Sequence, residues 1–205
     1  MPRMSLYISP TSPFARKARI VAHEQGLSGQ ITEVPSQLRT AENEVLAHSA
    51  TGKVPCLVVE DGPHQGLVLV ESTAVSDYLN RLGNPSLLQP EGDPAYWQDK
   101  ALDGFAHAFL DSIAWRTREG RRPENERSPG FVALETERQS RCFDALEAQA
   151  DALEAREISL GRILVAVALD FYDRRIGEDW RTAHPRLAAW QARMVDRPSF
   201  RATDA

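Results

Sequence analysis

The chain has 205 residues, of which 42% are hydrophobic and 26% charged, and its formal net charge is −5. These values are ordinary for a globular protein, and they supply enough apolar side chains for a buried core. A mildly acidic chain is poorly suited to nucleic acid or an anionic membrane, so neither is expected as a partner. The two cysteines lie far apart, which excludes a disulfide-rich scaffold and predicts no metal site.

Two further features bear on the compartment. The opening segment MPRMSLYISP lacks the apolar core of a signal peptide. No run of about 18 apolar residues is present that would span a membrane. With so few cysteines, which fits a reducing compartment, we expect a cytoplasmic protein.

Alternating strand and helix signals fill the first eighty residues. Helices are predicted over residues 13–25 and 72–82, each stopped by a glycine, and a weaker one over 40–48. Strands are predicted over residues 5–8, 31–34, 56–59 and 67–70; the last is apolar throughout and is expected to be buried on both faces. The order β-α-β-α-β-β-α predicts an α/β domain over residues 1–83.

Strand signals disappear after this point. Residues 84–93 contain Pro85 and Pro90 and are typical of a linker. Apolar residues then recur every four positions and predict a long helix from Pro94 to about Gly120. Further helices are expected over residues 131–155, over the almost wholly apolar residues 160–171, and from residue 185. The second domain, residues 94–205, is therefore predicted to be all-helical.

Ser12 and Pro13 stand at the predicted start of the first helix. The pair suits the N-cap and first helical positions. A capping hydroxyl accepts a bond from the helix and keeps its own proton to donate. Ser12 can therefore cap the helix, donate to a ligand beyond its start, or do both. Ser9 and Thr11 are neighbouring hydroxyls with the same potential.

Two other short segments offer binding groups. A cis bond between Val54 and Pro55, just after Lys53, would expose backbone groups to an extended peptide as an edge strand does. At the junction of a strand and a helix, Glu71-Ser72 combines a hydroxyl with helix N–H groups, which together can hold an anion. Plain capping by Ser72 explains the second segment equally well.

Three cations crowd the first helix. Arg16, Lys17 and Arg19 lie near its N-terminus, where positive charge opposes the helix dipole by a few tenths of a kcal/mol each. They have a role in neutralising acidic groups of the second domain, or they form a solvated face. A solvated face is expected for at least two of the three.

Together these motifs resemble the glutathione transferase superfamily, and in particular its small bacterial serine-type members. Ser12-Pro13-Phe14 with Arg16 sits where such members carry Ser-Pro-Phe or Cys-Pro-Phe. Val54–Pro55 matches the family's cis-proline, and Glu71-Ser72 matches the pair that holds the γ-glutamyl end. Residues 178–180, 184–190 and 197–200 resemble the ends of many members. The resemblance implies a thioredoxin-like first domain and an all-helical second domain.

The resemblance also implies glutathione as co-substrate, with Ser12 as the catalytic residue. A free thiol has a pKa of roughly 8.5, and lowering it by about two units takes roughly 2.7 kcal/mol of preference for the anion. A bond donated by Ser12, or by Thr11 or Ser9, and the positive helix end can supply it. The glutathione-binding residues implied are Ser12, Phe14, Lys53, Val54, Pro55, Glu71 and Ser72.

A pocket for a small hydrophobic electrophile is implied beside the second domain, together with a homodimeric assembly. The candidates for this pocket are Phe14, His107, Asp111, Trp115 and Arg118. His107 and Trp115 lie eight residues apart, on roughly one face of the predicted helix. Trp115 fits the helical core equally well.

One segment departs from the family pattern. Residues 158–162 stand where the family usually has Ser or Thr, then two residues, then Asp, which is a capping box. Arg162 replaces the acid, so the reciprocal bond to the cap is expected to be missing. We expect the fold to persist, with a less rigid link over residues 149–157.

Three functions remain open. The first is a transferase that conjugates glutathione to small electrophiles in detoxification. The second is a glutathione-dependent isomerase or lyase. The third is a non-catalytic regulatory or binding protein, like the stringent starvation proteins that bind RNA polymerase. Ser12 favours an enzyme, and a serine in place of cysteine argues against disulfide exchange. Cys56 and Cys142 are expected to be buried structural cysteines.

Overall fold

The computed structural model describes residues 1–88, 91–155 and 158–204. The chain forms two compact units, Met1–Gln89 with Pro198–Ala205, and Pro90–Arg197. The division predicted from the sequence differs at the end of the chain, since it assigned residues 198–205 to the helical part. Among the helices described, none is both long and apolar enough to cross a membrane.

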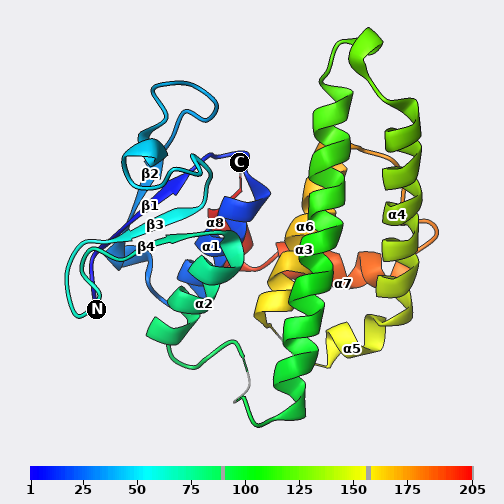
Figure 1. The fold of residues 1–205 in the computed structure, drawn as a ribbon. Helices are drawn as coiled ribbons and strands as arrows, with labels where there is room; N and C mark the ends of the chain where they lie inside the picture. Colours follow the sequence, from blue (N-terminus) through cyan, green and yellow to red (C-terminus); the bar gives the residue numbers. More distant parts are fainter. Residues whose placement is uncertain (89–90, 156–157, 205) are drawn as a thin grey trace. The chain divides into compact units, whose positions relative to one another are not determined.

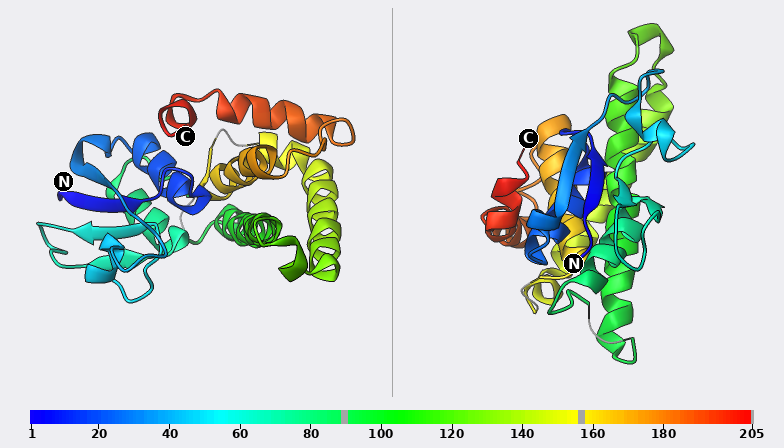
Figure 2. Two further views of the ribbon diagram at one scale, coloured as in Figure 1. Left: turned by 90° about the horizontal axis from the view of Figure 1, so that it is seen from above. Right: turned by 90° about the vertical axis from the view of Figure 1, so that its left-hand side faces the viewer.

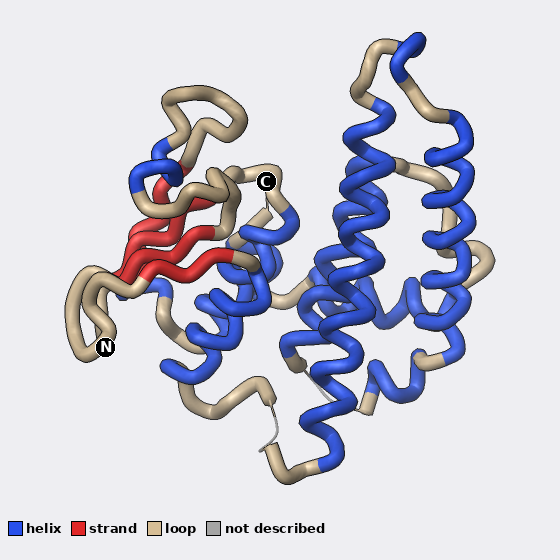
Figure 3. The backbone as a smooth tube through the Cα atoms, viewed as in Figure 1, coloured by secondary structure: helices blue, strands red, loops and turns tan. Residues whose placement is uncertain are grey.

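The first unit contains a four-stranded mixed sheet, drawn in red in Figure 3. Its strands are β1 (Met4–Ile8), β2 (Ile31–Pro35), β3 (Cys56–Val59) and β4 (Val68–Val70), in the order β2-β1-β3-β4. β1 pairs parallel with β2 and antiparallel with β3, and β3 pairs antiparallel with β4. The prediction that the last strand is buried on both faces is wrong. β4 is an edge strand, and its residues are only half-buried.

Two helices, α1 (Pro13–Glu24) and α2 (Ser72–Leu82), pack side by side in this unit (Figure 1). Alternate residues of β1 are buried, namely Met4, Leu6 and Ile8, as expected for a strand with one covered face. Gly26 ends α1 with φ 67°, the left-handed cap that the sequence predicted. The weaker helix predicted over residues 40–48 is reduced to a 3₁₀ turn, Glu44–Ala47.

The end of the chain covers the cationic side of α1. The short helix α8 (Pro198–Ala202) packs against α1. An Arg16 Nη donates to the carbonyl oxygen of Phe200 at 3.3 Å, and an Arg19 Nη donates to that of Thr203 at 3.2 Å. Lys17 is fully buried. The expected solvated face is therefore wrong: the C-terminal segment contacts Arg16 and Arg19, and Lys17 is buried.

The second unit is all-helical, as predicted. Its helices are α3 (Pro94–Gly120), α4 (Pro129–Ala148), α5 (Ala150–Glu154), α6 (Leu160–Arg175) and α7 (Pro185–Val195). α6 packs against α3 and α7 (Figure 2), and residues 160–169 are all buried, which confirms a central apolar helix. The helix predicted over residues 131–155 is interrupted at Gln149, where α4 gives way to α5.

The start of α6 lies very close to α3. A Cβ on Gly161 would stand 2.9 Å from backbone atoms of both Asp99 and Asp103, so only glycine permits this approach. Next to it, the buried Arg162 forms an ion pair with Asp99 at 3.0 Å. Its Nε also donates to the carbonyl oxygen of Leu153 at 2.9 Å. One side chain thus joins α6, α3 and the end of α5.

This contact changes the interpretation of the missing capping acid. Ser159 still caps α6 by accepting a bond from the Arg162 backbone N–H at 3.3 Å. Arg162 then binds carbonyls of α5, the kind of contact that satisfies the last acceptors of a helix. Residues 156 and 157 of the link expected to be less rigid lie outside the described residues. α5, within the same link, is held by Arg162.

We expect Arg162→Met to lower the free energy of unfolding of the second unit by about 3–5 kcal/mol. The substitution removes the guanidinium and leaves a buried carboxylate and the carbonyls of α5 without this partner. All four tryptophans, at positions 97, 115, 180 and 190, belong to this unit, so urea unfolding followed by tryptophan fluorescence reports on it.

The matched control is Arg141→Met. Arg141 is an exposed arginine of α4 that pairs with Glu137 at 3.9 Å, and a change there should stay within about 0.5 kcal/mol. Equal losses in the two variants would mean that Arg162 contributes no more than a surface ion pair.

Candidate functional site

The register of the sheet gathers three segments at one edge. Tyr7 lies opposite Cys56, and Cys56 lies opposite Val70. The C-terminal end of β1, the start of β3 and the C-terminal end of β4 therefore stand in one row. The segments predicted to bind a ligand start or end at this row: Ser12 follows β1, Val54–Pro55 precedes β3, and Glu71-Ser72 follows β4. Residues far apart in sequence thus meet at one edge.

Ser12 is the N-cap of α1, as predicted. Its backbone is extended, and its Oγ accepts a hydrogen bond from the Ala15 N–H at 3.3 Å. Its own N–H donates to the carbonyl oxygen of Ser9 at 2.9 Å. The hydroxyl proton takes part in none of these bonds and is free to be donated. Ser12 and Ser9 are half-buried, whereas Thr11 is exposed.

The Val54–Pro55 peptide bond is cis, the isomer that the resemblance implied. Before it lies a tight turn at Gly52, which has φ 56°. The Asn43 side chain holds this turn by donating to the Gly52 carbonyl oxygen at 2.8 Å. Lys53 itself is exposed. Sequence reasoning missed Asn43, because the prediction placed it inside a helix over residues 40–48, whereas it is the N-cap of the short turn Glu44–Ala47.

The start of α2 differs from the prediction. Ser72 is its first helical residue and not its N-cap, a position that Glu71 takes without a capping side-chain bond. Glu71 has φ 72° and ψ 133°, a conformation that residues with a Cβ rarely adopt. Ser72 is fully buried, and its Oγ has no hydrogen-bond partner within the described residues. A buried, unsatisfied hydroxyl beside a helix N-terminus is suited to a ligand's polar group.

Neither cysteine is activated for chemistry. Burial raises the pKa of the Cys56 thiol, which is fully buried in β3. The pKa of Cys142 is also raised, chiefly by burial, and this residue is half-buried in α4. Because only the thiolate is a good nucleophile, both side chains are suited to a structural role.

The residues predicted to line an electrophile pocket belong to different units. His107, Asp111 and Trp115 follow one another along α3, and the His107 Nε2 lies 3.8 Å from an Asp111 carboxylate oxygen. Phe14 belongs to α1 in the first unit. Trp115 is 42% exposed, so the alternative that it belongs to the core is wrong. A shared pocket stays a prediction.

The structure also bears on metal binding. Among the residues that it describes, no three or more His, Cys, Asp or Glu side chains are grouped to hold an ion.

Comparison with known proteins extends this description. The family described as glutathione S-transferase, N-terminal domain, matches residues 11–82. The chain is 27% identical to the uncharacterized GST-like protein YibF of Escherichia coli (strain K12), over 98% of each chain. It is 28% identical, over 98% of each chain, to a glutathione transferase family member from Pseudomonas fluorescens Pf-5. Crystal structures with bound glutathione and with bound S-(propanoic acid)-glutathione match with TM-scores of 0.89 and 0.86.

The backbone of Glu71 generates a prediction about stability. A residue held in such a conformation costs of order 1–3 kcal/mol, which glycine avoids. Glu71→Gly should therefore be more stable than Glu71→Ala by about 1 kcal/mol, once the greater freedom of unfolded glycine is included. Urea unfolding followed by circular dichroism compares the two. An alanine variant as stable as the glycine variant would show that position 71 is not strained.

Proposed function

The chain belongs to the glutathione transferase superfamily, and on that premise we propose that it binds glutathione at the edge of the sheet where the segments of Ser12, Pro55 and Ser72 meet. The observation that carries the proposal is the register that brings these three segments together. The glutathione-bound relative from Pseudomonas fluorescens Pf-5 supports it. The proposed enzyme is a glutathione S-transferase that acts as a homodimer on a small electrophile.

Each segment has a proposed part of the tripeptide. The backbone of Val54, beside the cis bond, pairs with the main chain of the cysteinyl residue. The first turn of α2 and the Ser72 hydroxyl receive the carboxylate of the γ-glutamyl end, which the positive helix end favours. The exposed Lys53 and half-buried Phe14 complete the binding residues. The sulfur then lies before the start of α1.

The chemistry proposed for Ser12 is stabilisation of a thiolate. Its Oγ already accepts from the helix, so its proton can be donated to the glutathione sulfur. A bond to a charged acceptor contributes about 1.5–3 kcal/mol, and the α1 dipole up to about 1 kcal/mol. Together they match the roughly 2.7 kcal/mol needed to lower a thiol pKa by about two units.

The reaction then proceeds by nucleophilic attack. The thiol proton leaves to solvent, and the sulfur electron pair forms a bond to an electrophilic carbon. Either a leaving group departs with its electron pair, or the resulting carbanion takes up a proton. The second outcome yields an S-alkyl conjugate, the class to which the S-(propanoic acid)-glutathione bound by the relative belongs. A stable conjugate distinguishes a transferase from an isomerase or lyase.

The role of Ser12 is tested by removing its hydroxyl in two ways. Ser12→Ala and Ser12→Gly should each raise the thiol pKa of bound glutathione by about 1–2 units and lower kcat/KM by about 10- to 100-fold at neutral pH. A titration of thiolate absorbance measures the pKa without an electrophile. Glutathione affinity should remain largely intact.

The two variants separate catalysis from capping. Glycine preserves most of an N-cap's contribution, whereas alanine loses about 1 kcal/mol, so equal kinetic effects point to the hydroxyl. The exposed Thr11→Ala serves as control. A wild-type thiol pKa in both Ser12 variants would end the proposed role. The same pKa rise in Thr11→Ala or Ser9→Ala would transfer that role to the neighbouring hydroxyl.

The buried Ser72 hydroxyl gives a second test. Ser72→Ala should weaken glutathione binding by about tenfold or more, because a bond to a charged group is lost. The unfolding free energy should fall by no more than about 0.5 kcal/mol, since the hydroxyl has no partner within the described part of the chain. Calorimetry and urea unfolding give the two quantities.

Ser76→Ala is the matched control. Ser76 lies one turn further along α2, and its buried hydroxyl is likewise without a partner in the described chain. Its loss should leave glutathione binding unchanged. A Ser72→Ala variant that loses stability but not affinity would make the hydroxyl structural. No glutathione binding by the wild-type chain at millimolar concentration would favour a regulatory or binding protein.

A further inference from the structure

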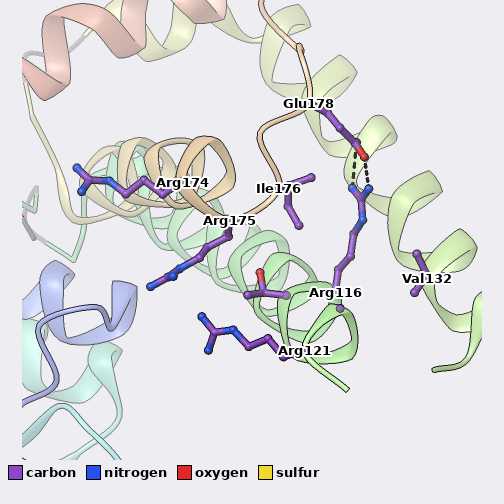
Figure 4. Close-up of a pocket in the computed structure, with 9 residues that line it drawn as sticks. Arg116, Arg121, Val132, Arg174, Arg175, Ile176 and Glu178 are labelled. Atoms are coloured by element: carbon purple, nitrogen blue, oxygen red, sulfur yellow. Dashed lines mark hydrogen bonds and ion pairs between the residues drawn. The ribbon is translucent and has the colours of Figure 1, made fainter. Parts of the chain in front are cut away.

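A cavity of about 380 Å³ lies within the second unit, between the C-terminal ends of α3 and α6 and the first turn of α4 (Figure 4). Four arginines line it: Arg116, Arg121, Arg174 and Arg175. The chain as a whole has more acidic than basic side chains, so this concentration of positive charge runs against its composition. The volume falls in the range of small-molecule sites.

Two of the four arginines are neutralised by carboxylates. Arg116 binds Glu178 with both terminal nitrogens, one of them at 3.1 Å. Glu178 also accepts from the Tyr172 hydroxyl at 2.9 Å, and the Arg116 hydrogen bond lowers the pKa of its carboxyl. Burial, with Glu178 beside it, raises the pKa of Tyr172 to about 12. Arg174 pairs with Asp170, one turn earlier in α6, at 2.7 Å.

The other two arginines lack such partners. Neither Arg121 nor Arg175 forms an ion pair with any residue that the structure describes, and the Arg175 Nε is buried without a hydrogen-bond partner there. Phe171 holds the Arg175 guanidinium, whose central carbon lies 5.5 Å from the ring centroid. In Figure 4 both side chains extend to the same side of the cavity, away from the Arg116–Glu178 pair. Two positively charged side chains thus point to the same side of the cavity.

We infer that this cavity is a binding site for a small organic acid, with Arg121 and Arg175 holding its carboxylate and an apolar body lying against Val132 and Ile176. Guanidinium groups bind carboxylates through paired N–H donors. Space and an apolar wall favour an organic molecule over a bare inorganic ion. This inference does not depend on glutathione binding.

The arginines also stand at helix ends, which offers a purely structural role. Gly120 and Arg175 are the last residues of α3 and α6, where cations interact favourably with the helix dipole. That role requires no ligand and predicts no preference between charged and neutral molecules. The discriminating measurement is therefore the affinity for an acid compared with that for its neutral analogue.

The probe is 4-phenylbutyrate, compared with its neutral amide and with inorganic phosphate, each titrated by calorimetry without glutathione. The acid should bind wild type about tenfold more tightly than either. The double variant Arg121→Gln/Arg175→Gln should bind the acid only as tightly as the amide. Its affinity for the amide should equal that of wild type. The exposed Arg141→Gln, in α4, should bind as wild type. Raising the salt concentration should weaken the binding of the acid and leave the binding of the neutral amide unchanged.

Amide chemical shifts of the wild-type chain locate the probe independently of any substitution. Perturbations should centre on residues 116–121 and 174–178. If the double variant does not fold, the single variants Arg121→Gln and Arg175→Gln provide the comparison. Equal affinity for acid and amide, undiminished binding by the arginine variants, or perturbations centred elsewhere would each overturn the inference. If phosphate bound as tightly as the acid, the inference that the ligand has an organic body would be wrong.

Discussion

The pairing of β3 with both β1 and β4 is the constraint on which the proposed glutathione site depends. The register sets Tyr7, Cys56 and Val70 in one row, so three loops leave the sheet at the same edge. A slip of one residue in either ladder would turn the side chains of β3 to the opposite face. The start of α1 and the start of α2 would then no longer flank the cis-proline loop. The three short motifs come together because the paired strands fix their spacing.

The first unit also depends on the far end of the chain. α8 and the residues after it satisfy cations of α1 through the carbonyl oxygens of Phe200 and Thr203. Buried cations are costly unless they are paired or hydrogen-bonded, so this segment and α1 stabilise each other. α1 is the helix whose N-terminus holds Ser12. The proposed thiol site thus rests on residues from both ends of the sequence.

Local patterns were enough to predict most elements but not their partners. The strand over residues 56–59 and the helices from Pro13, Ser72 and Pro94 were predicted because short-range signals, such as a proline at the first turn, determine them. The burial of Lys17 and the exposure of β4 depend on neighbours distant in sequence, which no local pattern specifies. Ser72 was taken for a cap because its type suits one, and the backbone of Glu71 showed otherwise. Family resemblance, and not periodicity, indicated the site residues.

Arg162 shows that one departure from a family pattern can exchange a local bond for a tertiary contact. From sequence, it is a missing acid and a lost reciprocal bond. In the structure the same position supplies a cation that reaches Asp99 on α3 and a carbonyl of α5. The replaced contact is local, whereas the new one joins three helices. The useful signal was present in the sequence, because Arg162 is the one charged residue within the run 160–169, and a charge buried among apolar residues must find a partner.

Whether a polar group has a partner within the chain also separates structural cations from those that suggest a ligand. Arg16, Arg116 and Arg162 each meet carbonyl or carboxylate oxygens supplied by the chain itself. Ser72 and the pair of Arg121 and Arg175 do not, within the described residues, although each lies at the end of a helix. In a folded protein most buried polar groups are satisfied, so the Ser72 hydroxyl and the Arg175 Nε, which are buried without a partner in the described chain, are candidates for contact with another molecule. Other buried groups share this property, the Ser76 hydroxyl among them, so the helix N-terminus beside Ser72 and the cavity beside Arg175 are what single these two groups out.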